Sequence, residues 1–225
     1  MGKHFSLTAA DKFQLGAYRA DPASPAKGGI VVIQEIFGVN HHIRAVCDRL
    51  ASEGYAAVAP ALFDRQQKNF ECGYTPDEIA NARKFVANPD WGAMLRDTQA
   101  AIDDLKKEGP VAIMGFCMGG TIAFLAACKL NGLSAAVCYY GGQIAKNADE
   151  KPKVPTQMHF GDKDASIPMS DVEVIKKKRS GDSEIYVYPD AQHGFHCDER
   201  GSFHDASAKT ARQRAMDFLE KHLKK

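Results

Sequence analysis

Net charge is almost absent from this sequence. Its 29 lysines and arginines are balanced by 28 aspartates and glutamates, so the formal net charge is +1. This balance argues against a nucleic-acid partner or a membrane-surface partner, because both require a marked excess of positive charge. The one dense basic run, residues 176–179, ends a helical pattern that starts near residue 168, and cations suit that end of a helix dipole. We interpret it as a solvated helix end.

Long apolar runs are missing as well. No uninterrupted stretch has the length needed to span a membrane, and the first residues, M-G-K-H-F-S-L-T-A-A-D-K, lack the apolar core of a signal peptide. There are only six cysteines, and Cys47, Cys128 and Cys138 fall in predicted core elements without the spacing of a disulfide framework. We therefore expect free thiols and a reducing, cytoplasmic location.

A regular alternation of strand and helix patterns fills most of the chain. With 225 residues, 44% of them hydrophobic, the chain can bury one sizeable core, and we expect a single domain over residues 1–225. The alternation predicts an α/β fold with a mostly parallel central sheet and helices on both faces. Strands are expected near residues 13–19, 30–34, 55–59, 111–116, 135–140, 154–160 and 185–188, and helices near residues 41–52, 91–107 and 206–222.

The alternation lapses between residues 62 and 91. Thr75-Pro76-Asp77-Glu78 is a capping box with proline at the first helical position, which predicts a short helix to about residue 86. We interpret this segment as a helical insertion over the functional site. The alternative is a surface helix that only covers a sheet edge.

Residues 111–120, V-A-I-M-G-F-C-M-G-G, carry the most specific signal. They read as the nucleophile elbow of an α/β-hydrolase fold, with Cys117 in the position usually taken by serine. Such a turn is strained and closely packed, which explains Gly115 and Gly119 two residues to either side. The helix N-terminus that follows should acidify the thiol to the reactive thiolate. The alternative is a helix packed on a sheet, with Cys117 as a small buried hydrophobe.

The acid and the base of an α/β-hydrolase follow the nucleophile along the chain, in that order. His193 lies in a loop just after a predicted strand, beside Gly194, and we expect it to be the general base. The loop after the preceding strand carries two carboxylates. Asp162 is nearer the strand end, where turn and cap roles are common, so we favour Asp164 as the group that orients His193 and keep Asp162 in reserve.

Together these motifs resemble the dienelactone hydrolase (carboxymethylenebutenolidase) family over nearly the whole chain. The resemblance rests on Q-E-I-F-G-V-N at residues 34–40, G-Y-A-A-V-A-P at 54–60, G-F-C-M-G-G at 115–120, residues 161–168 and H-G-F at 193–195. The cysteine elbow and the Q-E-I-F-G-V-N segment are specific together, and the other pieces would be weak alone. The resemblance implies a Cys117, Asp164, His193 triad that cleaves small esters or lactones without a cofactor.

Glu35 and two backbone amides complete the expected site. The resemblance implies that Glu35 contacts the thiol and takes part in its activation when substrate binds. From the residues alone, Glu35 should be poorly solvated, and its carboxylate should be paired or protonated; the alternative is a structural acid bonded to loop amides. In this architecture the N–H of Met118 stabilises the oxyanion, and the resemblance adds the N–H of Ile36.

The chain departs from the family pattern where substrate binds. The resemblance implies a dienelactone whose carboxylate is held by two arginines, one of them four residues after the catalytic histidine. That position is Cys197 here; Arg200 is the nearest replacement, and Arg83 in the insertion is a candidate for the other. We expect the partner to be a small-molecule ester or lactone, and the protein to be a monomer or small homo-oligomer.

Two other interpretations stay open. His193, His196, Cys197 and His204 have metal-ligand side chains, but they lie in a single loop without a second ligand cluster, so we expect no metal. The scaffold could also serve as a ligand receptor, or its thiol as an oxidation sensor. A receptor would not need a nucleophile, a base, an acid and Glu35 together, and a sensor usually has a resolving cysteine nearby, so we favour the hydrolase.

Overall fold

An eight-stranded sheet forms the centre of the protein in the computed structural model, which describes residues 2–224. The strand order across the sheet is β1-β2-β4-β3-β5-β6-β7-β8. The six strands from β4 to β8 in this order pair in parallel, whereas β1 and β2 are antiparallel. The strands are β1 (Lys3–Thr8), β2 (Gln14–Ala20), β3 (Gly29–Ile33), β4 (Ala56–Pro60), β5 (Val111–Phe116), β6 (Leu133–Tyr139), β7 (Thr156–Gly161) and β8 (Ser183–Tyr188).

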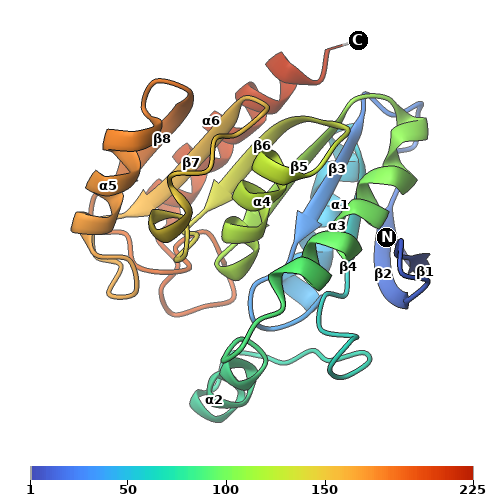
Figure 1. Ribbon diagram of the computed structural model, residues 1–225, viewed down its shortest axis with the longest axis horizontal. Helices are drawn as coiled ribbons and strands as arrows, with labels where there is room; N and C mark the ends of the chain where they lie inside the picture. Colours follow the sequence, from blue (N-terminus) through green and yellow to red (C-terminus); the bar gives the residue numbers. More distant parts are fainter. Residues whose placement is uncertain (1, 225) are drawn as a thin grey trace.

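Helices cover both faces of the sheet, as predicted. In Figure 1, α1 and α6 lie behind the sheet, α3, α4 and α5 lie in front of it, and α2 stands apart, beyond the carboxyl ends of the strands. The helices are α1 (His41–Ser52), α2 (Pro76–Lys84), α3 (Trp91–Leu105), α4 (Met118–Lys129), α5 (Met169–Arg179) and α6 (Asp205–His222). The predicted α/β architecture with a mostly parallel sheet is therefore confirmed.

The hydrophobic core lies on both faces of the central strands. Every residue of β3, β4 and β5 is buried, because parallel strands with helices on both sides have no solvent face. Helix α4 is apolar and buried along almost its whole length, since it lies over the middle of the sheet. This rigid centre carries the strand ends from which the candidate site is built.

Two helix starts depend on side-chain caps that the sequence predicts. The Asn40 side chain accepts the Ile43 N–H at the start of α1. At the start of α2, Thr75 and Glu78 form a reciprocal capping box. The second cap fixes the beginning of the helix in the insertion, which packs little against the sheet.

One strand, β1, was not predicted. Its sequence, K-H-F-S-L-T, alternates only weakly between polar and apolar residues, and Leu7 is its one buried residue. The strand lies at the sheet edge and pairs with β2 alone. An edge strand that buries so little leaves almost no pattern in the sequence.

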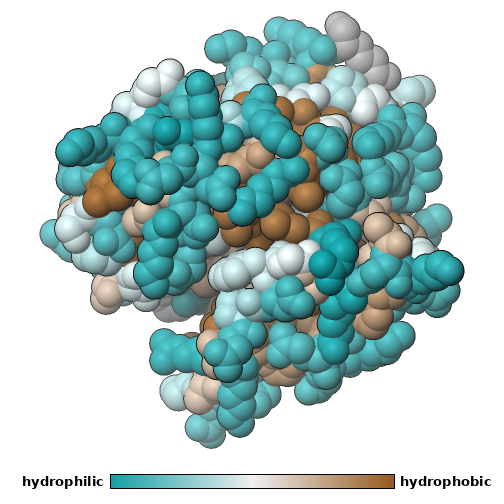
Figure 2. Space-filling model, viewed as in Figure 1, coloured by the Kyte–Doolittle hydropathy of each residue, from teal (hydrophilic) through white to brown (hydrophobic). Residues whose placement is uncertain are grey.

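The surface is mainly hydrophilic on the face shown in Figure 2, with apolar surface gathered near its middle. No helix in residues 2–224 is both long enough and apolar enough to cross a membrane.

Candidate active site

Cys117 occupies the turn between β5 and α4, where it is the N-terminal cap residue of the helix. Its backbone is in the left-handed region, with φ 56° and ψ −119°, which is strained for a residue with a side chain. The flanking glycines have no room for a Cβ: one on Gly115 would lie 1.9 Å from the carbonyl oxygen of Gly119, and one on Gly119 would lie 2.4 Å from that of Ile33. The steric reason given for the Gly-x-Cys-x-Gly pattern therefore holds in the structure.

The turn opens into a pocket of about 590 Å³ at the carboxyl ends of the strands. Cys117 and His193 both line it. The insertion forms one wall, with Ile79 and Arg83 from α2 and Val86 just after that helix. The predicted position of the insertion over the site is thus the one observed. The remaining lining residues are Ile36, Phe37, Ala87, Pro89, Trp91, Met118, Thr121, Gly142, Gln143, Ser166 and Arg200.

His193 is hydrogen-bonded to Asp164 in the loops that follow β8 and β7. Nδ1 of His193 lies 2.7 Å from Oδ2 of Asp164. A carboxylate can only accept, so Nδ1 carries the proton and Nε2 is left for the pocket. The other oxygen of Asp164 accepts the N–H groups of Ser166 and Ile167 at 2.8 and 3.2 Å, which fixes the buried carboxylate.

Asp162, the alternative candidate for the acid, is hydrogen-bonded to the main chain and not to His193. Its Oδ1 accepts the N–H of Asp190 at 2.7 Å and so joins the loop after β7 to the loop after β8. Asp190 itself has a positive φ of 58°. Asp162 therefore braces the turn that leads to His193, which agrees with the turn role expected for it.

The protonation of His193 depends on its neighbours. Burial by itself would lower the pKa of this imidazole, but a thiolate at Cys117 and the hydrogen bond from His193 to Asp164 raise it to about 10. The imidazolium form is therefore favoured while a thiolate lies beside it. A cysteine and a histidine side by side are the two groups that nucleophilic catalysis by a thiolate uses.

Glu35 is buried, with about 1% of its surface exposed, at the end of β3. One oxygen of its carboxylate accepts from Nη1 of Arg200 at 3.0 Å. The expectation that this acid is paired is met, and the partner is the arginine proposed as a substrate ligand. No hydrogen bond between Glu35 and Cys117 occurs within residues 2–224.

The two amides expected to form the oxyanion hole both border the pocket. Ile36 lies in the turn after β3, and Met118 is the first residue of α4. In the described part of the chain no main-chain oxygen accepts the N–H of either residue. Both donors are thus available to a ligand oxygen, as an oxyanion hole requires.

The arginines and Cys197 define the charge of the pocket. Arg83, from α2, and Arg200, from the loop after β8, both line it. Arg200 also lies over the rings of Phe37 and Tyr74, with its guanidinium carbon 5.3 and 5.9 Å from their centroids. Cys197 is fully buried, and burial raises the pKa of its thiol to about 12.

The loop that suggested a metal site does not bring its four residues together on one ion. His193 is bonded to Asp164, His204 to Ser207 and Cys197 to the hydroxyl of Tyr74. His196 is half-buried and packs against Phe116 and Tyr139, and desolvation lowers its pKa to about 3. The side chains of this loop thus have separate, mainly structural partners.

Sequence reasoning missed Tyr140, which packs edge-on against His193 with ring centroids 5.2 Å apart. Its backbone has a positive φ of 38°, its side chain is fully buried, and its hydroxyl has no hydrogen-bond partner in residues 2–224. In the sequence it is one of two adjacent tyrosines at the end of a predicted strand, and nothing in that pattern separates it from a core residue. Three further residues that line the pocket, Trp91, Thr121 and Gln143, were also not predicted from the sequence.

Comparison with known proteins gives one consistent result. Residues 15–223 match the model of the dienelactone hydrolase family. A carboxymethylenebutenolidase from Pseudomonas putida is 31% identical, over 95% of this chain and 94% of that protein. A Synechocystis sp. protein, provisionally named carboxymethylenebutenolidase, is 38% identical over 94% of this chain and 93% of its own length.

A solved structure extends the similarity to three dimensions. The crystal structure of a protein from Klebsiella pneumoniae, provisionally named dienelactone hydrolase, superposes with a TM-score of 0.85 at 31% identity. It covers 98% of this chain, and this chain covers 99% of it. The α/β-hydrolase fold expected from the elbow is thereby confirmed.

Proposed function

The chain belongs to the dienelactone hydrolase family, and on that premise we propose that it hydrolyses small activated esters and lactones through a Cys117, His193 and Asp164 triad. Membership makes it a hydrolase of esters or lactones. The main support for the proposed triad is the hydrogen bond between His193 and Asp164 at 2.7 Å. His193 lines the same pocket as Cys117. The three groups thereby fill the roles of base, orienting acid and nucleophile.

Acylation begins from the ion pair of Cys117 and His193. The thiolate sulfur attacks the carbonyl carbon, and the carbonyl electrons move to its oxygen, which the N–H groups of Ile36 and Met118 stabilise. When this intermediate collapses, the bond to the leaving-group oxygen breaks, and the imidazolium can supply the proton that this oxygen takes. The product is a thioester on Cys117 and a released alcohol or enol.

Deacylation needs a neutral imidazole, and the chemistry supplies one. Once Cys117 is a thioester it no longer carries the charge that raises the pKa of His193. His193 can then accept a proton from water as the water oxygen attacks the thioester carbon. Collapse expels the thiolate, releases the carboxylic acid and leaves the proton on His193, so the starting ion pair returns.

Thiolate chemistry limits the substrate. A thiolate is itself a good leaving group, so the first intermediate proceeds only when the alcohol side leaves as easily, as an enolate or an aryl oxide does. Amides are therefore poor substrates. The pocket lining also includes the apolar side chains of Ile79, Val86 and Trp91, which suits a small and largely apolar ester or lactone.

A burst assay tests the proposal. Mixing micromolar enzyme with p-nitrophenyl acetate should release about one equivalent of nitrophenol rapidly if deacylation is the slower step, followed by steady turnover. Mass spectrometry of a quenched sample should place the acetyl group on the peptide that contains Cys117. Absence of both release and acylation would contradict the proposal and would favour a binding or sensing role for the scaffold.

A further inference from the structure

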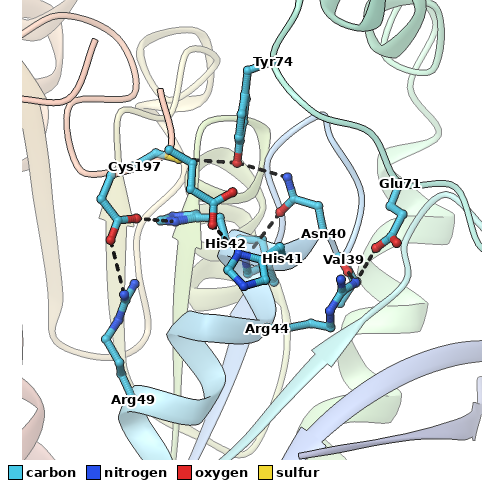
Figure 3. Close-up of polar contacts among 12 residues, drawn as sticks. Val39, Asn40, His41, His42, Arg44, Arg49, Glu71, Tyr74 and Cys197 are labelled. Carbon is cyan, nitrogen blue, oxygen red and sulfur yellow. Dashed lines mark hydrogen bonds and ion pairs between the residues drawn. The ribbon is translucent and has the colours of Figure 1, made fainter. Parts of the chain in front are cut away.

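Four consecutive side chains, residues 197–200, are each hydrogen-bonded to an earlier part of the chain, the first to Tyr74 and the other three to residues 35–42. The segment comes shortly after His193 in the same loop. The first contact is from Cys197, whose thiol donates to the hydroxyl of Tyr74 at 3.4 Å. That hydroxyl also accepts from the side chain of Asn40 at 3.0 Å (Figure 3).

The next two contacts reach the first turn of α1. Oδ1 of Asp198 lies 3.2 Å from Nδ1 of His42, and the carboxylate of Glu199 lies 2.5 Å from Nδ1 of His41. Figure 3 shows both histidines turned toward this segment from the start of the helix. The fourth contact is the pair of Arg200 with Glu35. We call residues 197–200 and their four partners, Tyr74, His42, His41 and Glu35, the clasp.

The clasp joins the two sides of the candidate active site. Residues 35–42 carry Glu35 and the N–H of Ile36, whereas residues 197–200 extend the loop of the base, His193. Arg200 is the one member that reaches the pocket, and its neighbour Asp198 is bonded to α1 rather than to the pocket. The contact of Asp198 with α1 lies outside the pocket and two residues from Arg200, so it can restrain the main chain from which the guanidinium reaches Glu35.

Resting on the function proposed above, we propose that the His42 and Asp198 pair is a positioning pair for the hydrolysis, acting by holding Arg200 against Glu35. His42 is fully buried, and Asp198 is the one hydrogen-bond partner of its side chain within residues 2–224. Because a carboxylate only accepts, this contact fixes both the tautomer and the orientation of the ring. Arg49, at 3.5 Å, holds the second oxygen of Asp198 from the same helix.

The same groups do not favour a cation site, although ligand atoms of His42, Asp198 and Glu199 lie within 4.8 Å of one another. A histidine that binds a metal donates its other N–H to an acceptor, and the buried Nε2 of His42 has none in the described part of the chain. Arg49 also competes for Asp198. Mutual binding of these side chains explains the cluster without an ion.

The test compares kcat and KM for p-nitrophenyl acetate in variants on either side of the pair. Asp198→Ala and His42→Leu should each lower kcat about tenfold, as loss of a charge-assisted contact does, while KM changes less than about twofold. His42→Asn should keep kcat within about threefold of wild type, because its amide can donate from the position of Nδ1. In an Arg200→Ala background, Asp198→Ala should have almost no further effect, since the pair acts through Arg200.

Controls separate positioning from stability. Asp149→Ala removes an exposed carboxylate that pairs with Lys178 far from the site, and it should leave kcat unchanged. Thermal unfolding midpoints show whether each variant is folded. A folded Asp198→Ala protein with wild-type kcat, or a loss that is just as large without Arg200, would overturn the proposal.

The rate of Cys117 alkylation by iodoacetamide gives a readout that does not depend on esterase activity. The Arg200 charge acts on Cys117, so moving the guanidinium should alter this rate. If the wild type cleaves no ester, the proposed function fails. In that case the clasp is still supported if Asp198→Ala and Arg200→Ala change the alkylation rate by similar factors and the double variant changes it no further. The clasp is refuted if Asp198→Ala leaves the alkylation rate unchanged.

Discussion

Asp164 and Asp162 are two residues apart, yet the first holds His193 and the second holds the main chain of the turn that leads to it. Asp164 lies 2.7 Å from the imidazole, and Asp162 lies 2.7 Å from the N–H of Asp190. The loop therefore separates an orienting role from a bracing role, and each can be removed without the other.

Replacing each aspartate by asparagine tests this division. Asp164→Asn should lower kcat by about 10³ to 10⁴, because an amide can impose the wrong tautomer on His193. Asp162→Asn keeps an oxygen acceptor for the Asp190 N–H, so kcat should stay within about fivefold of wild type. The two kcat values on one aryl ester are the measurement. A larger loss in Asp162→Asn would show that the acid is wrongly assigned.

Cys117 should be the reactive thiol among the six. Burial raises the pKa of the other five cysteines, to about 12 for Cys128 and Cys197. Iodoacetamide at neutral pH should therefore label Cys117 first, as peptide mass spectrometry can show. Cys117→Ala should remove esterase activity and keep the unfolding midpoint near that of wild type. Equal labelling of another cysteine, or turnover in the Ala protein, would contradict this.

The titration of His193 should depend on Cys117. The pKa of about 10 means that the imidazole keeps its proton through neutral pH and loses it only as the pH rises through that value. Cys117→Ala removes the largest contribution that raises the pKa and leaves burial, which lowers it, so the pKa should move down. Alkylated wild type should behave like the Ala protein. NMR titration of the His193 ring is the measurement, and an unshifted value in both would refute the ion pair.

Glu35→Gln should lower kcat more than it raises KM. The carboxylate is buried and bonded to Arg200, so its loss leaves a guanidinium unpaired beside the thiol and displaces a charge close to the reaction. We expect kcat to fall about tenfold or more and KM to change by less than about threefold. The reverse pattern, a raised KM with unchanged kcat, would identify Glu35 as part of the substrate-binding surface instead.

Substrate charge gives the last prediction. Arg200 is already paired with Glu35, and the position where the resemblance implies an arginine holds the buried Cys197. The enzyme should therefore prefer a neutral lactone or methyl ester to the matching carboxylated dienelactone. The ratio of kcat/KM for the dienelactone and its methyl ester measures this, and a strong preference for the free acid would contradict it.

Arg83→Ala and Arg200→Ala then locate any carboxylate contact that remains. Introducing arginine at position 197 would be a poor test, because the Cys197 side chain is fully enclosed and a larger one would disturb the fold.

Much of this arrangement could be predicted because the sequence signals are local. The parallel strands are apolar throughout, the caps of α1 and α2 use the expected side chains, and the elbow needs its glycines within two residues of Cys117. Strand β1 could not be predicted since it buries only Leu7.

The pairing of Glu35 with Arg200 was equally hidden. It joins groups 165 residues apart in the chain, and sequence pattern carries no information on which charges meet across a folded loop. From the sequence, Glu35 was expected to act on the thiol and Arg200 to bind substrate, which are separate roles. Only the positions of the two loops show that each is the other's partner.

The elbow has a consequence for any attempt to change the enzyme by random mutation. The strand and the helix touch so closely at Gly115 and Gly119 that any side chain there would overlap main-chain atoms. Cys117, between them, points into an open pocket and could be exchanged for serine or alanine at little structural cost. A mutant library would therefore tolerate a new nucleophile sooner than a single methyl group beside it, and within the elbow itself functional change is confined to the side chain at the tip of the turn.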